Sequence, residues 1–214
     1  MAISVFTFPV GLYQCNCSII VDEDTNEALI IDPGDDSELI LHKVQEQGLK
    51  VKFLLHTHAH LDHFGATSKV KKQCCDAKSV LHKDDLFLYD LHKEQSLMLQ
   101  LPQTEIDPID HYLDDEETFS FGGENLSAIV TPGHTPGSTC FKLETNEKQI
   151  IFSGDTLFRS SIGRTDLPGG DAHKIINSIK SRLLTLDDDF QVIPGHGPSS
   201  SIAFEKRSNP FVRT

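Results

Sequence analysis

The run from His58 to His63 concentrates side chains that bind metals. It contains three histidines and one aspartate, namely His58, His60, Asp62 and His63. Alternate residues of an extended segment point to the same side, so His58 and His60 are expected to share a face. Imidazole and carboxylate groups are ligands that suit Zn, Fe or Mn. The run therefore predicts the nucleus of a metal site.

Three more residues of the same kind follow, each in a turn that contains glycine. His134 lies in the segment 131–137, Asp155 in 152–156 and His196 in 193–198. Glycine lets the backbone approach closely or adopt a positive φ, so a ligand in such a turn can point inward. We expect all three side chains to join the first cluster.

Together these residues exceed what one tetrahedral metal requires. Two metals that share one bridging carboxylate fit the set better, with Asp155 as the bridge. The predicted first trio is His58, His60 and His134, and the predicted second trio is Asp62, His63 and His196.

Two divalent metals that share a carboxylate predict hydrolytic chemistry. Metal binding lowers the pKa of water from about 15.7 to about 7, which makes hydroxide available as a nucleophile. The metals also polarise a substrate carbonyl and stabilise the oxyanion that develops on it. Asp62 is expected to act beyond metal binding, by orienting the hydroxide and passing on its proton.

The remaining histidines and the cysteines are expected to be structural. His56 has the parity of His58 but lies deeper in the preceding strand, so it is expected outside the ligand set. Cys15 and Cys17 would share one face of a strand, yet no second thiol pair follows at a zinc-finger spacing. An odd total of five cysteines without a secretory signal indicates reduced thiols and a cytoplasmic location. The isolated histidines are His42, His82, His92, His111 and His173.

Length and composition indicate one globular domain that spans residues 1–214. No apolar run approaches the roughly 20 residues that cross a bilayer, so no membrane contact is expected. The formal charge of -13 should repel phosphate backbones, which argues against a nucleic-acid substrate. Bound cations would offset part of this charge. A small molecule is therefore the expected partner.

The pattern of strands and helices indicates a layered sandwich. Strands are expected near 3–8, 17–22, 28–31 and 51–55, and again near 118–121, 126–131, 138–143, 149–153 and 190–193. Helices are expected near 37–47, 64–74, 84–100 and 171–184, and the leucines of 84–100 are expected to face the core. Two groups of strands, each ending with a helix and a strand, predict two sheets packed face to face with helices outside. The ligand candidates fall in loops after strand ends, where functional residues collect.

The ligand pattern resembles that of the metallo-β-lactamase superfamily. The resemblance extends from the first strand to Pro198 and rests on His58-x-His60-x-Asp62-His63, His134, Asp155 and His196. It implies an α/β fold, a four-layer αββα sandwich in which two mixed β-sheets are flanked by helices. It also implies that the metals lie at one edge of the paired sheets, with the division of ligands given above.

Within that superfamily the chain is similar to the short bacterial glyoxalase II-like proteins. The similarity rests on the segments 154–158, 161–170, 194–198 and 209–211. It implies a hydroxyacylglutathione hydrolase-like thioesterase that uses two divalent metals, Zn first, on S-D-lactoylglutathione or a related acyl thioester. Arg164 stands where a basic residue of those enzymes holds a glutathione carboxylate, a role that suits an arginine fork. The competing interpretation of Arg164 is an internal ion pair with Asp166.

Two features depart from full-length glyoxalase II. Only the segment 197–214 follows His196, so the C-terminal helical region that adds glutathione contacts in those enzymes is not expected. Asp166 also occupies a place where a tyrosine is expected. Thioester or ester hydrolysis is therefore a firmer expectation than the recognition of glutathione.

Three rival functions use the same fold. Mononuclear iron persulfide dioxygenases share the pattern at 163–166, although the turn at 194–198 looks more like that of the hydrolases. A lactonase or a β-lactamase would use the same hydroxide, and the sequence does not exclude either one. A ribonuclease is disfavoured by the acidic charge. Metal content and oxygen uptake would separate the dioxygenase from the hydrolases.

Overall fold

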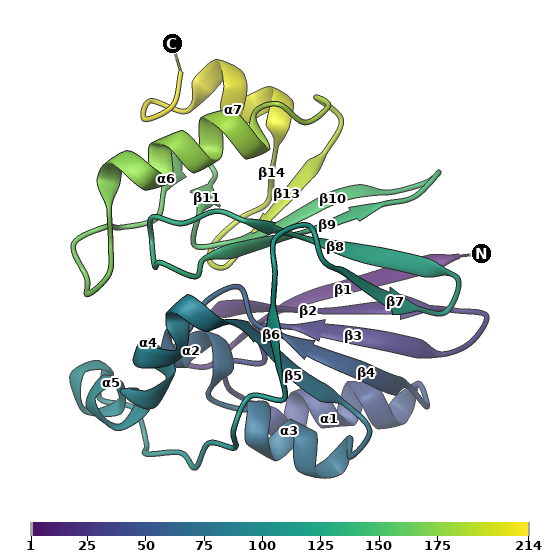
Figure 1. Ribbon diagram of the computed structural model, residues 1–214. Helices are drawn as coiled ribbons and strands as arrows, with labels where there is room; N and C mark the ends of the chain where they lie inside the picture. The colour runs from purple at the N-terminus through teal and green to yellow at the C-terminus, as the bar shows by residue number, and fades with distance from the viewer. Residues whose placement is uncertain (1, 214) are drawn as a thin grey trace.

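Two six-stranded β-sheets pack face to face in the computed structural model, which describes residues 2–213 (Figure 1). Helices cover the outer face of each sheet, so the layers follow the order helix, sheet, sheet, helix. Each sheet contains both parallel and antiparallel neighbours. This confirms the predicted αββα sandwich with two mixed sheets.

The first sheet has the strand order β1-β2-β3-β4-β5-β6. Its strands are β1 (Ile3–Val10), β2 (Cys15–Asp22), β3 (Glu27–Ile31), β4 (Lys50–Leu55), β5 (Lys78–His82) and β6 (His111–Leu113). Neighbours from β3 to β6 run parallel, and parallel neighbours need crossover connections. Helices within these crossovers are α1 (Ser37–Glu46), α2 (Leu61–Phe64), α3 (Thr67–Gln73), the 3-10 turn η1 (Lys83–Asp85), α4 (Leu86–Asp90) and α5 (His92–Leu99).

The second sheet has the strand order β14-β13-β10-β9-β8-β7. Its strands are β7 (Thr118–Phe121), β8 (Glu124–Val130), β9 (Thr139–Glu144), β10 (Gln149–Gly154), β13 (Gln191–Pro194) and β14 (Ser200–Ser201). The outer elements are the ribbon of β11 (Leu157–Phe158) and β12 (Ser161–Ile162), then α6 (Ala172–Ser178), its π-helical continuation η2 (Ile179–Leu183) and α7 (Ile202–Ser208). Because β9 is antiparallel to both β8 and β10, and β13 is parallel to β10, the strands β8, β10 and β13 share one direction.

Apolar side chains from both sheets fill the space between them. Leu29 and Leu55 of the first sheet belong to the same buried cluster as Phe141 of the second. Separate apolar layers join each sheet to its helices, through Ile40 of α1 on one side and Ile175 of α6 on the other. Each sheet is thus buried on both faces, which explains why its central strands are nearly continuous apolar runs.

The structure differs from the sequence-based expectations in the middle of the chain and near its end. The strands β5, β6 and β14 and the helix α7 were not expected. The helix expected at 64–74 begins earlier, at Leu61, and breaks near Gly65, where a Cβ atom would lie 2.7 Å from the Gly34 carbonyl oxygen. The helix expected at 84–100 is divided at Leu91 into α4 and α5. Across residues 2–213, no helix is long and apolar enough to span a bilayer.

Candidate metal centre

The ligand candidates collect at one edge of the paired sheets because they follow strands of shared direction. The run 58–63 follows β4, and His134, Asp155 and His196 follow β8, β10 and β13. The carboxyl ends of strands with one direction meet at the same edge of a sheet. Backbone hydrogen bonds then join the two sheets at this edge: Thr139 N–H donates to Thr57 O at 2.8 Å, and Asn16 N–H donates to Gly195 O at 2.7 Å.

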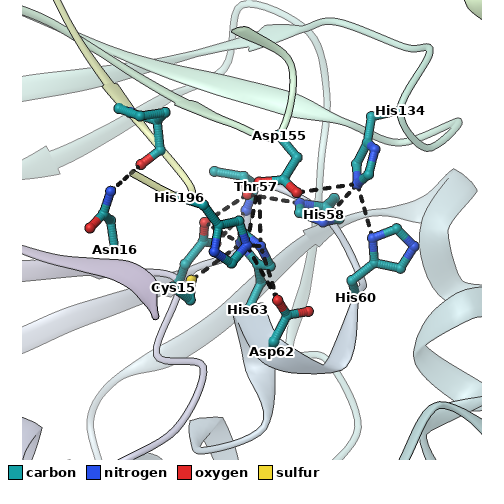
Figure 2. A network of polar contacts seen from close by, with 12 residues as sticks. Cys15, Asn16, Thr57, His58, His60, Asp62, His63, His134, Asp155 and His196 are labelled. Atoms are coloured by element: carbon teal, nitrogen blue, oxygen red, sulfur yellow. Dashed lines mark hydrogen bonds and ion pairs between the residues drawn. The ribbon is translucent and has the colours of Figure 1, made fainter. Parts of the chain in front are cut away.

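The first predicted trio is brought together by the fold (Figure 2). His134 Nε2 lies 3.3 Å from His58 Nε2 and 2.9 Å from His60 Nδ1. His134 donates from Nδ1 to the carbonyl oxygen of Arg164 at 2.7 Å, so its Nε2 presents a lone pair to the other two rings. This convergence of ring nitrogens is the arrangement that a bound metal requires.

The second predicted trio also converges. His63 Nε2 lies 3.1 Å from His196 Nε2, and Asp62 Oδ2 lies 3.3 Å from the same His196 atom. His196 donates from Nδ1 to the carbonyl oxygen of Tyr13 at 2.9 Å, which again leaves a lone pair on the inward nitrogen. In each trio, a backbone carbonyl acceptor thus fixes the tautomer of one histidine.

Asp155 lies between the two trios, as Figure 2 shows. Its Oδ1 atom is 3.5 Å from His63 Nε2 and 3.8 Å from His196 Nε2, whereas its Oδ2 atom is 3.6 Å from His134 Nε2. Oδ1 is buried and has no hydrogen-bond partner within residues 2–213. A buried carboxylate oxygen without a donor is costly, and a cation at this point would remove the cost.

The pKa values of His58 and His60 also fit divalent metals. Burial, together with His134, lowers the pKa of His60 to about 3. Burial and the neighbouring His63 lower the pKa of His58 well below its ordinary value. Both rings are therefore neutral near pH 7, which is the state that binds metal. Lone pairs of His58 and His134 that face each other across 3.3 Å repel unless a cation lies between them.

Glycines allow the ligand loops to close on one another. A Cβ atom at Gly195 would lie 2.3 Å from Asp155 Oδ1 and 2.7 Å from His63 Cε1. A Cβ atom at Gly34 would lie 1.7 Å from the carbonyl oxygen of Asp62. No other residue fits at either place without moving a ligand, as expected for glycine-containing turns at a ligand site.

Asp32 supports the cluster through hydrogen bonds, although it is not among the residues predicted from the sequence. It follows β3, is 1% exposed and has a left-handed backbone with φ 51°. Its carboxylate accepts from Thr57 N–H at 2.8 Å, from the Thr57 hydroxyl at 2.7 Å and from His63 Nδ1 at 2.9 Å. The Thr57 hydroxyl in turn accepts from His58 Nδ1 at 3.1 Å. One carboxylate thus orients a ligand of each trio, and its only signal in the sequence was an acid at the end of a buried strand.

His56 lies outside the cluster, as expected. Its Nδ1 atom is 2.7 Å from Val80 O and its Nε2 atom is 2.7 Å from Thr67 Oγ1, so both ring nitrogens are used in the core.

Cys15 and Cys17 are buried side chains of β2 and belong to an apolar cluster. Cys15 Sγ lies 3.5 Å from the outer nitrogen of His63, Nδ1. Burial raises the pKa of Cys15 to about 12, so its thiol stays protonated. Both residues agree with the structural role that the spacing of cysteines predicts.

Gln95 of α5 holds the backbone on both sides of His60. Its Oε1 atom accepts from Leu61 N–H at 2.9 Å, and its Nε2 atom donates to Ala59 O at 3.0 Å and to Leu88 O at 2.8 Å. The Gln95 side chain therefore satisfies backbone groups of the loop that carries His60, as the backbone of a neighbouring strand would do.

Asp85 joins two ligand loops in a similar way. Its buried carboxylate accepts from Ala59 N–H at 3.0 Å, from the Thr135 hydroxyl at 2.7 Å and from Gly137 N–H at 2.6 Å. The loop after β4 and the loop of His134 are thus held at a fixed separation.

We expect Gln95→Ala to weaken metal binding about 10-fold to 100-fold, the range for partners that orient a ligand. The substitution leaves Leu61 N–H and Ala59 O without their side-chain partner, so the free energy of unfolding should fall by about 1–3 kcal/mol. Competition with a chelator and urea unfolding measure the two effects. Lys93→Ala, an exposed change on the same helix, is the control and should alter neither. Metal affinity equal to that of the wild type would contradict this role for Gln95.

A cavity of about 300 Å³ opens above the cluster, and the candidates His60, Asp62, His134 and Asp155 line it. Arg164 also lines it, but its guanidinium donates to Asp166 at 2.8 and 2.7 Å, as the competing interpretation of Arg164 predicted.

The expectation that the leucines of 84–100 face the core holds for Leu88 and is wrong for Leu97, which is exposed. Short helices interrupted at Leu91 present only part of each turn to the core.

Comparison with known proteins identifies the family. The profile of the metallo-beta-lactamase superfamily matches residues 10–196. The chain belongs to this superfamily, and it is a metal-binding hydrolase of that kind.

Three similar proteins illustrate where the chain lies within the superfamily. It is 41% identical to the hydroxyacylglutathione hydrolase GloC of Haemophilus influenzae, over 96% of each chain. It is similar to the crystal structure of BLEG-1 B3 metallo-beta-lactamase, with a TM-score of 0.87, 34% identity, and coverage of 99% of this chain and 100% of that one. It is also similar to TTHA1623 in a di-iron-bound form, with a TM-score of 0.84, 36% identity, and coverage of 96% and 99%. The likeness to GloC confirms the resemblance to glyoxalase II-like members of the superfamily.

Proposed function

We propose that the protein is a dinuclear metal-dependent thioesterase of the glyoxalase II type, which acts on S-D-lactoylglutathione or a related acyl thioester. The observation that carries this proposal is Asp155, whose two oxygens each face a different trio of ligands. The di-iron-bound form of the similar protein TTHA1623 supports two metals. The name of the relative GloC supports a hydroxyacyl thioester as substrate.

The proposed ligand sets are those that converge in the structure, with Asp155 shared between them. One metal would be held by His58, His60 and His134, and the other by Asp62, His63 and His196. When bound there, two such metals would supply a hydroxide nucleophile near neutral pH and would polarise the acyl carbonyl. Zn is the metal proposed first, and the di-iron neighbour makes Fe the alternative.

Asp62 is the residue proposed to orient the nucleophilic hydroxide and to accept its proton. Asp62 lines the cavity, and its carboxylate lies 3.3 Å from His196 Nε2. Burial would raise the pKa of Asp62, but the nearby imidazoles of His63 and His196 hold it below its ordinary value. The group is thus charged at neutral pH and can accept a hydrogen bond from the attacking oxygen.

Asp62→Asn is expected to reduce turnover about 100-fold to 10,000-fold, the range for loss of a positioned acid or base. Asparagine keeps the shape of the side chain but accepts no proton. Turnover and metal content are measured on the same preparation, so that a lost metal is recognised. Asp90→Asn, an exposed change in α4, should leave both unchanged. Full turnover with both metals retained would exclude Asp62 from the proton transfer.

Metal analysis followed by substrate comparison tests the proposed function. We expect two metals per chain and hydrolysis of S-D-lactoylglutathione without oxygen uptake. One iron per chain with oxygen consumption on a persulfide would favour the dioxygenase. A strong preference for a lactone or a β-lactam would instead favour a lactonase or a β-lactamase. The likeness to BLEG-1 B3 metallo-beta-lactamase supports this second candidate function.

A further inference from the structure

We propose that the cavity above the cluster of ligand candidates accepts acyl thioesters whose leaving thiol is neutral and apolar, in preference to those of charged glutathione. This proposal rests on the proposed thioesterase function and narrows its substrate class. It follows from the lining of the cavity, from the hydrogen bonds already made there and from its charges.

The wall of the cavity is apolar. The helices α4 and α5 supply one part of this wall, and the loop after β12 supplies another. The apolar side chains are Leu88, Leu91, Met98, Leu99, Leu167 and Pro168. Leu91 is 39% exposed and Met98 is 65% exposed, so both gain burial when an apolar group lies against them. The ligand candidates would place polar groups beside the reacting bond, and the wall supplies apolar surface for the rest of the substrate.

The polar groups within this wall are mostly engaged by the protein itself. The Tyr13 hydroxyl donates to the carbonyl oxygen of Leu99 at 3.1 Å. The amide group of Gln95 makes hydrogen bonds to three backbone groups. Glu94 also lines the cavity, and its carboxylate favours cations rather than anions. A charged ligand would therefore find few donors along this surface.

The positive charge that glutathione would need is already compensated. Arg164 is the only cationic side chain that lines the cavity within residues 2–213. Its two-bond fork to Asp166 is the geometry that would otherwise hold a substrate carboxylate. The hydrogen bond from Arg164 lowers the pKa of Asp166 to about 2, so this carboxylate is charged at neutral pH. Glutathione carries two carboxylates and one ammonium group, and the carboxylates would also meet the negative charge of Glu94.

The test compares two thioesters that share one acyl group. S-D-lactoylglutathione is compared with the D-lactoyl thioester of benzyl mercaptan, an uncharged alkyl thiol that carries a phenyl ring. The proteins are the metal-loaded wild type, Met98→Lys and Leu97→Lys. Leu97 is the matched control because it is 71% exposed on the same helix but does not line the cavity. Comparison between proteins cancels the difference in intrinsic reactivity of the two thioesters.

We expect the wild type to have a kcat/KM for the benzyl thioester at least about tenfold above that for the glutathione thioester, a ratio typical of an apolar pocket. Met98→Lys should reduce this ratio by about tenfold or more, mainly through KM, because a cation replaces apolar surface and favours carboxylates. Leu97→Lys should leave the ratio unchanged.

Preference of the wild type for the glutathione thioester would overturn the proposed substrate class and leave the thioesterase function intact. An equal response of the ratio in both lysine variants would also overturn it, because the effect would then reflect surface charge rather than the cavity wall. Failure to hydrolyse either thioester would instead overturn the thioesterase function, and the substrate class with it.

Discussion

Asp155→Asn is expected to lower thioester turnover by about 100-fold to 1,000-fold or more, the cost of losing one electrostatic stabiliser of a transition state. The two oxygens of Asp155 face separate ligand trios at 3.5 and 3.6 Å, so one substitution acts on both proposed metals. An asparagine offers one neutral oxygen and one NH₂ group, and the NH₂ group binds no metal. The metal content should therefore fall below two per chain.

Stability separates the loss of metal from the loss of fold in this variant. Asp155 Oδ1 has no hydrogen-bond partner within residues 2–213, so the substitution breaks no native hydrogen bond of that atom. The metal-free variant should melt at or above the temperature of the metal-free wild type. Added metal should raise the melting temperature of the wild type more than that of the Asp155→Asn variant, since a ligand stabilises the state that binds it. Calorimetric melting with and without metal measures both effects.

Asp171→Asn is the matched control for this prediction. Asp171 caps α6 by accepting from His173 N–H and Lys174 N–H, and asparagine is an equally good N-cap. Turnover, metal content and melting temperature should all stay at wild-type values. Retention of two metals and full turnover in Asp155→Asn would contradict the bridging role.

Asp32→Asn is expected to keep the fold and to lose most of the activity. The position has φ 51°, a left-handed conformation that asparagine tolerates better than most residues. The new amide can still accept from Thr57 N–H, but it no longer offers two acceptor oxygens to Thr57 and His63. The His63 ring then loses the partner that selects its tautomer, and metal affinity should fall about 10-fold to 100-fold.

Asp32→Ala should be more damaging to the fold than Asp32→Asn. Removal of the carboxylate leaves buried donors of Thr57 and His63 unsatisfied, and each buried donor left without its partner costs about 1–3 kcal/mol. Urea unfolding of the two variants measures this difference, and chelator competition measures metal affinity. Asp22→Asn is the control, because Asp22 is also buried and accepts from the N–H and hydroxyl groups of Thr25. It lies at the end of β2 that is farther from the ligand cluster. It should change stability without changing metal affinity, and an equal loss of affinity in this control would refute the specific role of Asp32.

The sequence determined the chemistry of the centre because ligand type is a local property. Histidine and aspartate bind metals whatever surrounds them, and the glycines beside His134 and His196 revealed that these residues lie in turns. The apolar strand before His58 placed the first cluster at a strand end. The layered fold was similarly readable, because the two groups of strands are apolar on both faces and alternate with helices.

The short elements and the groups that support the ligands depended on tertiary contacts. The strand β5 carries little periodicity of its own and forms because β4 and β6 pair with it on both sides. Asp32 acts on His63 across 31 positions of the chain, and Gln95 acts on Ala59 across 36. Hydrogen bonds over such separations leave no local pattern for a sequence to display.

The pocket shows the same division. The sequence identified Arg164 but left its partner open between a substrate carboxylate and Asp166. Only the structure shows the guanidinium in a two-bond contact with Asp166 and the apolar side chains of α4 and α5 beside it. The residue types needed for metal chemistry are therefore written in the sequence, whereas the charge and shape of the substrate site arise from side chains that meet only after folding.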